Sequence, residues 1–201
     1  MRIWAKICGV TLVEDALAAI EAGADALGVN FCKRSARYCD PEAARRIVEV
    51  VGGRVDVFGV FVGASREQIA ATMELTGISG VQLHGGEDAS LALGWEVPVI
   101  RAVAVDGADR VRTAIRERGD ERLLLDSPRG GGSGTRIDER LLEGIDLSAI
   151  VLAGGLDPSN VAEAIRRLRP WGVDTASGVE VTAGVKDHRL IKEFIDNVSA
   201  A

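Results

Sequence analysis

Two residues that could exchange protons with a substrate stand at the ends of short apolar runs in this sequence. Cys8 ends the run at residues 2–8, and Asp126 ends the run at residues 122–126. A thiolate and a carboxylic acid can together remove a proton from one atom of a substrate and deliver a proton to another. Cys8 and Asp126 are therefore a candidate acid–base pair.

Four further polar side chains occupy comparable places after apolar runs. A guanidinium can hold a carboxylate through two charge-assisted hydrogen bonds, and an imidazole or an amide can contact a polar substrate. In a barrel of parallel strands, the loops after the strands share one mouth, so these residues are expected to lie together. They are Arg37, in a loop between Ser35 and Tyr38; Gln82 and His84, at the end of the run 79–83; and Arg101, near the end of the run 97–102.

Two glycine-bearing segments in the last third of the chain suggest an anion site. Glycine lets the backbone approach an anion closely, and the N-terminus of a following helix presents further N–H groups. In a (β/α)8 barrel, the loops after the seventh and eighth strands are the frequent phosphate position. A phosphate site is therefore predicted at Gly154, Gly155, Ala176, Ser177 and Gly178.

A third glycine cluster, GGGSG at residues 130–134, follows Asp126. Its composition allows a flexible surface loop, and it equally allows a cover that closes over a bound substrate. The sequence leaves open whether the loop at 127–135 closes.

Each polar candidate also has a purely structural interpretation. A cysteine at a strand end is often a small buried apolar side chain. Asp126 could cap a loop, His84 could be a hydrogen-bonded structural residue, and Arg37 could be a solvated charge. The functional interpretation is favoured because the candidates converge on one mouth. Cys32 and Cys39 lack that support and are interpreted as bystanders.

The elements that would position these residues alternate along the chain. Eight short β-forming segments alternate with segments of helical periodicity, and no long linker interrupts them. Each β segment is nearly continuously apolar, as expected for strands covered on both faces. The predicted strands are residues 2–8, 26–31, 55–62, 79–83, 97–102, 122–126, 148–152 and 171–175.

Helix start and stop signals mark several of the intervening segments. Thr11, Pro41, Ser65 and Pro158 are predicted to lie just before or within first helical turns, and Gly23 and Gly77 are predicted to end helices. The predicted helices are residues 12–23, 42–51, 66–77 and 159–169, two short helices at 88–94 and 138–143, and a last helix opened by His188.

Eight units in 201 residues give about 25 residues per unit, which suits a compact (β/α)8 TIM barrel. A doubly wound open sheet is the rival α/β fold. The barrel is favoured because there are eight units and no GxGxxG follows the first strand. Similar segments such as GADALGVNF and TGISGVQLHG also suggest a repeated unit. We therefore predict a single barrel domain over residues 1–201.

Composition and charge limit the classes of partner. A hydrophobic content of 47% supports a substantial core, and a net charge of −6 argues against a nucleic-acid or anionic-membrane surface. No run approaches the ~20 apolar residues of a membrane span. The first residues lack the apolar core of a signal peptide, and three unpaired cysteines fit reduced thiols. A cytoplasmic location is predicted.

The sequence offers little to bind a metal or an organic cofactor. Its two histidines, His84 and His188, have no metal-ligand spacing, and its cysteines are not arranged as CxxC pairs. No nicotinamide or flavin motif is evident. We therefore expect no cofactor, and we expect a small molecule as the substrate.

Seven ordered motifs extend over essentially the whole chain. They are KICG (6–9), the RSARY stretch (34–38), GVQLHG (80–85), LLLD (123–126), GGSGT (131–135), LAGGLDPSNV (152–161), and VDTASGVE with GVKD (173–180 and 184–187). Together they resemble the motifs of the phosphoribosylanthranilate isomerases. Two positions depart from that family's common pattern: residues 175–178 read Thr-Ala-Ser-Gly where Val-Ser-Ser-Gly is common, and Ala36 stands where a proline is common.

The resemblance implies a reaction and a role for each site residue. The reaction would be the Amadori rearrangement of N-(5'-phosphoribosyl)anthranilate, with Cys8 as general base and Asp126 as general acid. Arg37 would bind the anthranilate carboxylate, the glycine loops would bind the phosphate, and Gln82 and His84 would lie beside the substrate. A monomer and a homodimer both remain open.

Other phosphosugar enzymes and a non-catalytic barrel are the alternatives. The related histidine-pathway isomerase is expected to have aspartate where this chain has Cys8. Indole-glycerol-phosphate synthase would need a catalytic lysine and an extra N-terminal helix, and phosphopentose epimerases would need metal ligands. A non-catalytic phosphate-binding barrel would keep the glycine loops but would not need Cys8 and Asp126 together.

Overall fold

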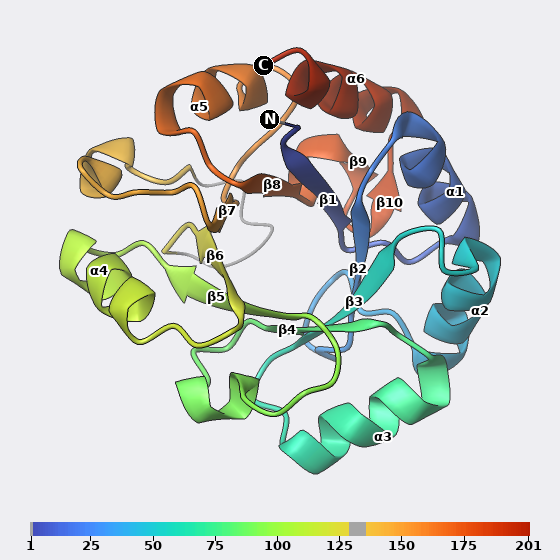
Figure 1. Cartoon of the computed structure of the whole chain (residues 1–201). Coiled ribbons are helices and arrows are strands. Elements are labelled where there is room, and N and C mark those ends of the chain that lie inside the picture. The colour runs from blue at the N-terminus through green and yellow to red at the C-terminus, as the bar shows by residue number, and fades with distance from the viewer. Residues whose placement is uncertain (1, 129–135) are drawn as a thin grey trace.

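The computed structural model describes residues 2–128 and 136–201. Eight parallel strands follow one another around a closed barrel, and the last pairs with the first through Trp4 and Gly172 (Figure 1). Closure excludes the doubly wound open sheet and confirms the predicted barrel. The strands are β1 Trp4–Cys8, β2 Ala26–Asn30, β3 Asp56–Phe61, β4 Gly80–Leu83, β5 Val99–Ala104, β6 Arg122–Asp126, β7 Ile150–Leu152 and β8 Gly172–Thr175.

Helices cover the outside of the barrel (Figure 1). Single 3-10 turns replace the helices after β4 and β6, where the sequence predicted short helices. The helices are α1 Val13–Ala22, α2 Pro41–Val51, α3 Arg66–Thr76, α4 Ala108–Arg116, α5 Val161–Leu168 and α6 His188–Ser199, and the 3-10 turns are η1 Ala89–Ala92, η2 Glu139–Leu142 and η3 Ser177–Val179. None of the helices described in the structure is long and apolar enough to cross a membrane.

Most of the predicted helix signals act as expected. Pro41 opens α2, and Ser65 caps α3 in a reciprocal pair with the side chain of Gln68. Gly23 and Gly77 end α1 and α3 in left-handed conformations that favour glycine.

Two of the predicted start signals act differently. Leu12 precedes α1, which has no side-chain cap, because the Thr11 hydroxyl instead donates to the carbonyl of Gly184. Asn160, rather than Pro158, is the residue that precedes α5. The hydroxyl of Thr11 thus ties the start of α1 to the turn after β9 (Glu180–Thr182), next to β10 (Val185–Lys186).

Alternate residues of each strand face the barrel interior and form layers. An apolar layer near the amino ends of the strands contains Phe58 and Leu124, with Trp4 and Trp171 packed against it. Along β1 the same face then carries Lys6 and finally the side chain of Cys8, as the two-residue period of a strand requires. The polar residues therefore come together at the carboxyl ends of the strands, where the loops after the strands lie.

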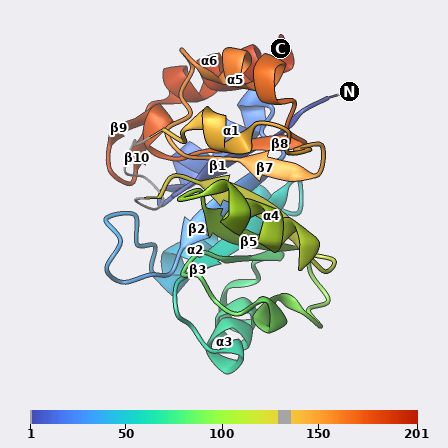
Figure 2. The same ribbon diagram turned by 90° about the vertical axis from the view of Figure 1, so that its left-hand side faces the viewer.

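The side view shows the segments that surround this end. The loop between β2 and α2 and the β9–β10 hairpin both project at the end of the barrel where the strands finish (Figure 2). Residues 31–40 and 180–186 are far apart in the sequence, and closure of the barrel brings β1 between β2 and β8. Both segments can therefore contribute to one site.

Candidate active site

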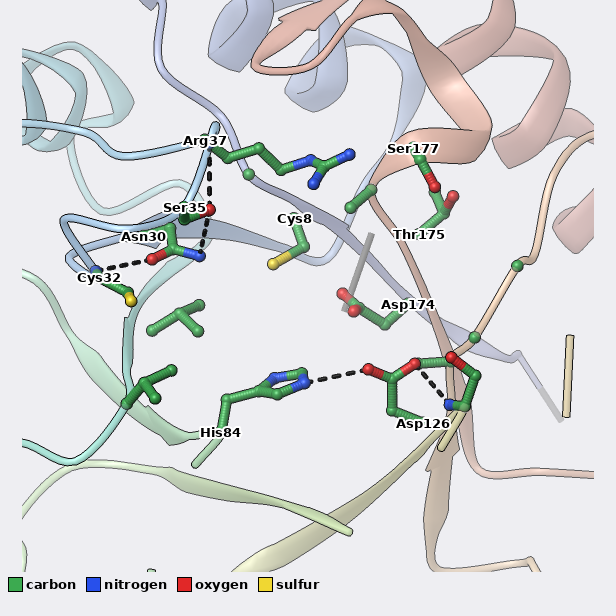
Figure 3. A pocket seen from close by; sticks show the side chains of 18 of the residues that line it. Cys8, Asn30, Cys32, Ser35, Arg37, His84, Asp126, Asp174, Thr175 and Ser177 are labelled. Atoms are coloured by element: carbon green, nitrogen blue, oxygen red, sulfur yellow. Dashed lines mark hydrogen bonds and ion pairs between the residues drawn. The ribbon is translucent and has the colours of Figure 1, made fainter. Parts of the chain in front are cut away.

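A cavity of about 310 Å³ opens at the carboxyl ends of the strands. Figure 3 shows Cys8, His84 and Asp126 projecting toward it from three different strands or strand ends. Most of the predicted site residues share this cavity, as the barrel geometry requires. Those that line it are Cys8, Arg37, His84, Asp126, Gly154, Gly155, Ala176 and Ser177.

Three of the predicted residues lie outside the cavity lining. Arg101 was expected at the mouth, and this expectation is wrong: β5 continues to Ala104, and its inward face carries Ile100. Arg101 therefore faces outward, where its Nε and Nη2 donate to Glu121 at 3.1 and 2.9 Å. Gln82 contacts His84, which lines the cavity, but does not line the cavity itself. Gly178 likewise packs against the backbone of the lining residue Leu156. The predicted cover at 130–134 falls outside the described residues.

Cys8 shares the barrel interior with a buried ion pair. Lys6 has a fully buried side chain, and its Nζ lies 2.8 Å from Oδ1 of Asp174 on β8. Gly28 on the neighbouring strand makes this arrangement possible: a Cβ there would lie 2.8 Å from the Cys8 sulfur and 3.0 Å from the Lys6 nitrogen. The thiol is thus held beside a cation in a space that a larger residue at position 28 would fill.

Burial and charge act in opposite directions on the Cys8 thiol. Desolvation raises its pKa, and the ammonium group of Lys6 opposes that effect without cancelling it. The net result is a thiol whose pKa is above its usual range. Its thiolate, the form that can act as a base, therefore accumulates only as the pH rises through that elevated pKa.

This direction gives a testable pH dependence. We expect alkylation of Cys8 by iodoacetamide to accelerate with pH around a midpoint above about 8.5, the ordinary value for cysteine. Mass spectrometry of the Cys8 peptide over a pH series measures the midpoint, and the half-buried Cys32 provides an internal comparison. A midpoint below the ordinary value would show that the neighbouring lysine outweighs burial.

A chain of hydrogen bonds orients Asp126. Its Oδ2 lies 3.0 Å from Nε2 of His84, and its Oδ1 accepts from the backbone N–H of Ser127 at 2.7 Å. The amide Nε2 of Gln82 lies 2.9 Å from Nδ1 of the same histidine. When the amide donates to Nδ1, Nε2 is the ring N–H that donates to Asp126. Gln82 thus acts on the carboxyl group through His84.

Arg37 is held at the opposite side of the cavity by its loop and by a distant glutamate. Its backbone N–H donates to the hydroxyl of Ser35, and its guanidinium forms an ion pair with Glu180 at 2.7 Å. Gly9 lies beneath the side chain, where a Cβ would come within 2.5 Å of the Arg37 Cδ. Since φ of Gly9 is also +71°, both space and backbone conformation favour glycine there.

The two predicted phosphate loops pack directly on one another. Gly154 and Gly155 have φ values of +79° and +69°, and the hydroxyl of Thr175 donates to the carbonyl of Leu156 at 2.7 Å. Gly178 faces the same carbonyl, because a Cβ on it would lie only 2.0 Å from that oxygen. Gly178 therefore allows the loop after β8 to lie against the loop after β7.

This packing makes Gly178 a test of the paired loops. We expect Gly178→Ala to force the loops apart, at an overpacking cost of about 1–3 kcal/mol, and to raise the inhibition constant of inorganic phosphate. Gly107→Ala is the matched control, because Gly107 has an extended backbone and nothing within 4 Å of the added Cβ. An unchanged inhibition constant of phosphate in a folded Gly178→Ala protein would show that anion binding does not depend on the contact between the two loops.

Three residues around the site were not assigned a role from the sequence: Asp174, Glu180 and Lys186. Asp174 occupies an inward position on β8, where it pairs with Lys6 on β1. Glu180 and Lys186 lie within sequence motifs already noted, but their pairing depends on the β9–β10 hairpin. Within residues 2–128 and 136–201, no three His, Cys, Asp or Glu side chains are grouped to hold a metal ion.

Comparison with known proteins gives consistent relatives over nearly the full chain. A family model described as N-(5'phosphoribosyl)anthranilate (PRA) isomerase matches residues 5–197. The N-(5'-phosphoribosyl)anthranilate isomerase of Myxococcus xanthus is 44% identical over 97% of this chain and 95% of its own.

Solved structures agree with this relationship. The phosphoribosyl anthranilate isomerase of Thermotoga maritima has a TM-score of 0.90 and 40% identity, covering 99% of this chain and 100% of its own. A phosphoribosyl anthranilate isomerase in complex with reduced 1-(o-carboxyphenylamino)-1-deoxyribulose 5-phosphate has a TM-score of 0.88 and 38% identity, with the same coverage. This chain belongs to the phosphoribosylanthranilate isomerase family.

Proposed function

We propose that this protein converts N-(5'-phosphoribosyl)anthranilate to 1-(o-carboxyphenylamino)-1-deoxyribulose 5-phosphate, a step of tryptophan biosynthesis. One observation carries the proposal: a single cavity is lined by a thiol, a carboxyl group, an arginine and two glycine loops. These are the groups needed to abstract a proton, donate a proton and hold two anionic ends of one substrate. Family membership supports the same reaction.

Asp126 is the proposed acid for the first step. Protonated Asp126 donates its proton to the ring oxygen of the ribose, the C1–O bond breaks, and the nitrogen lone pair forms a Schiff base at C1. The contacts with His84 and the N–H of Ser127 hold the carboxyl group in one orientation for this transfer. Gln82 supports that orientation from behind the lining, rather than by lying against the substrate.

Cys8 is the proposed base for the second step. Its thiolate removes the proton from C2, and the electrons of that C–H bond form the C1=C2 double bond of an enolamine. The enolamine then becomes the ketone as C1 gains a proton and the C2 hydroxyl loses one. Lys6 is the cation nearest to the thiolate that this step requires, and it stabilises that charge.

The two ends of the substrate would be held by different parts of the cavity. The glycine loops at 154–155 and 176–178 present backbone N–H groups to the phosphate. Arg37 approaches from the loop after β2 and suits the carboxylate on the aromatic ring, because a planar guanidinium matches a carboxylate. The complexed relative contains a ligand that carries both a phosphate and a carboxyphenyl group, which agrees with two anchors.

Turnover separates this function from the alternatives. We expect the purified protein to convert phosphoribosylanthranilate, while a non-catalytic phosphate-binding barrel would bind it without forming product. Parallel incubation with the larger aminoimidazole substrate of the histidine-pathway isomerase tests the other phosphosugar reaction. Binding without conversion of either substrate would refute the enzyme proposal.

Arg37→Met tests the carboxylate anchor. We expect it to raise KM for phosphoribosylanthranilate by an amount that corresponds to about 2 kcal/mol or more, because a partly desolvated charged pair is lost. The inhibition constant of inorganic phosphate should stay nearly unchanged, and Arg37→Lys should restore KM only in part. If both constants worsen together, Arg37 belongs to the phosphate site or to the fold.

The cellular setting and assembly follow from the same proposal. Three free cysteines fit a reducing cytoplasm, and a small phosphosugar is the proposed partner. A Thermotoga maritima relative with TM-score 0.87 is described as monomers generated from a dimeric enzyme. For this chain a monomer and a homodimer both suit a site whose described lining comes from one chain.

A further inference from the structure

Glu180 connects the proposed carboxylate anchor to the body of the barrel. We propose that Glu180 is a positioning residue, which fixes the guanidinium of Arg37 in the orientation that receives the carboxylate on the substrate's aromatic ring. This inference rests on the proposed function. It adds a residue that determines selectivity for the carboxylate-bearing substrate, although that residue does not line the cavity.

The contact between the two side chains is bidentate and shielded from water. Nε of Arg37 donates to Oε1 of Glu180 at 2.8 Å, and Nη2 donates to Oε2 at 2.7 Å. The glutamate side chain is only 5% exposed, and that of the arginine is 13% exposed. A fork-to-fork pair of this kind fixes the plane of the guanidinium as well as its position.

The stem of Arg37 is fixed independently of this pair. It lies over Gly9, and the loop that carries it is braced by Ser35, whose hydroxyl contacts both Asn30 and the Arg37 backbone (Figure 3). Loss of Glu180 would therefore leave the arginine in the site but release the rotation of its charged end. The loss should impair recognition of a planar anion and should not remove the arginine from the cavity.

Lys186 provides the charge balance that the positioning requires. Its fully buried Nζ lies 2.8 Å from Oε1 of Glu180 and also donates to the carbonyl oxygens of Cys8 and Ala176. One carboxylate thus lies between two cations, so the three side chains together keep one positive charge. An Arg–Glu pair alone would be neutral and would attract a substrate carboxylate less.

Glu180 remains ionised in this setting. Burial raises the pKa of its carboxyl group, but the hydrogen bonds and charges of Arg37 and Lys186 outweigh burial and lower the pKa overall. Glu180→Gln keeps the size of the side chain but replaces one acceptor oxygen with an N–H₂ group that faces a donor. The variant therefore removes one arm of the fork with little change in volume.

The test compares two substrates that differ only in the ring carboxylate. We expect Glu180→Gln to lower kcat/KM for phosphoribosylanthranilate by about tenfold or more. For phosphoribosylaniline, which lacks the carboxylate, kcat/KM should change by less than about threefold, within the range of a surface substitution. A general structural defect would lower both values equally. The decisive readout is therefore the substrate ratio, which is kcat/KM for phosphoribosylanthranilate divided by kcat/KM for phosphoribosylaniline.

Two further proteins make the result interpretable. Combining Arg37→Met with Glu180→Gln should give the same ratio as Arg37→Met alone, because a residue that acts through Arg37 has no effect without it. Glu121→Gln is the matched control, since Glu121 is a buried partner of another arginine, Arg101, outside the cavity. This control should leave the substrate ratio at the value of the unmodified protein.

Each result supports or overturns a defined statement. If Arg37→Met lowers the ratio and folded Glu180→Gln does not, Glu180 has no positioning role. If Arg37→Met itself leaves the ratio unchanged, the proposed carboxylate anchor fails first. If Glu180→Gln fails to fold, Glu180→Asp replaces it in the test. Aspartate keeps the charge, but its shorter side chain withdraws the carboxylate from the guanidinium of Arg37, so the same selective loss is expected. An unchanged substrate ratio in Glu180→Asp would overturn the inference.

Discussion

Cys8→Ala is expected to reduce kcat by about 100- to 10,000-fold, the usual contribution of a general base. Without the thiolate, no group at the end of β1 can take the proton from C2, because the side chain at that position becomes a methyl group. Lys6 remains beside the site as a cation and cannot replace a base while it is protonated. Steady-state rates with phosphoribosylanthranilate measure the loss.

Binding should survive this substitution. Cys8 contributes one small side chain to the lining, while the phosphate loops and Arg37 lie on other parts of the cavity. The dissociation constant of the reduced product analogue should therefore change little, since a base acts mainly in the transition state. A folded Cys8→Ala protein with near-normal kcat would remove Cys8 from the mechanism.

Asp126→Asn is expected to lower kcat by a similar factor, about 100- to 10,000-fold, because an amide cannot deliver the proton to the ring oxygen. The fold should tolerate it. The new amide can accept from the N–H of Ser127 and donate to Nε2 of His84, provided that the histidine proton moves to Nδ1. That proton then needs an acceptor, and rotation of the Gln82 amide supplies Oε1, a buried oxygen with no hydrogen-bond partner among the described residues.

Thermal unfolding and ligand binding serve as controls for this variant. A melting temperature within about 4 °C of the unmodified protein would correspond to a stability change near 1 kcal/mol. The product analogue should still bind. If Asp126→Asn retained most of the turnover rate, the proton donor for ring opening would have to be another residue of the cavity.

The barrel could be predicted because its strands are short, apolar and regularly spaced. All eight predicted segments overlap an observed strand, and no predicted end differs from the observed end by more than two residues. One such difference mattered: β5 extends to Ala104, so Arg101 lies in the middle of a strand on its outward face. Apolar residues on both faces of a buried parallel strand conceal which face points inward.

The site could be predicted in part, for a related reason. Cys8 and Asp126 end strands and His84 directly follows one, and the rule that barrel sites lie at the carboxyl ends of strands brings them together. Gln82 precedes His84 by two residues, and its placement behind the histidine depends on how deep each layer lies. Sequence spacing alone does not give that depth.

The contacts that position the site residues were beyond reach of the sequence. Arg37 and Glu180 are 143 residues apart, and Lys6 and Asp174 are 168 residues apart. Their pairing depends on β1 lying between β2 and β8, and on a short hairpin that places Glu180 beside the loop after β2. Closure of the barrel creates these neighbours, whereas local propensity and periodicity report only on nearby residues.

Proton NMR of phosphoribosylanthranilate incubated with the protein in D₂O tests the central claim most directly, because it follows the C2 proton that Cys8 is proposed to remove. The unmodified protein is expected to abolish the C2 proton signal and to produce the ketone, and Cys8→Ala at the same concentration is expected to leave that signal in place. Persistence of the C2 proton with the unmodified protein, or its loss at an equal rate with Cys8→Ala, would contradict Cys8-dependent isomerisation in this barrel.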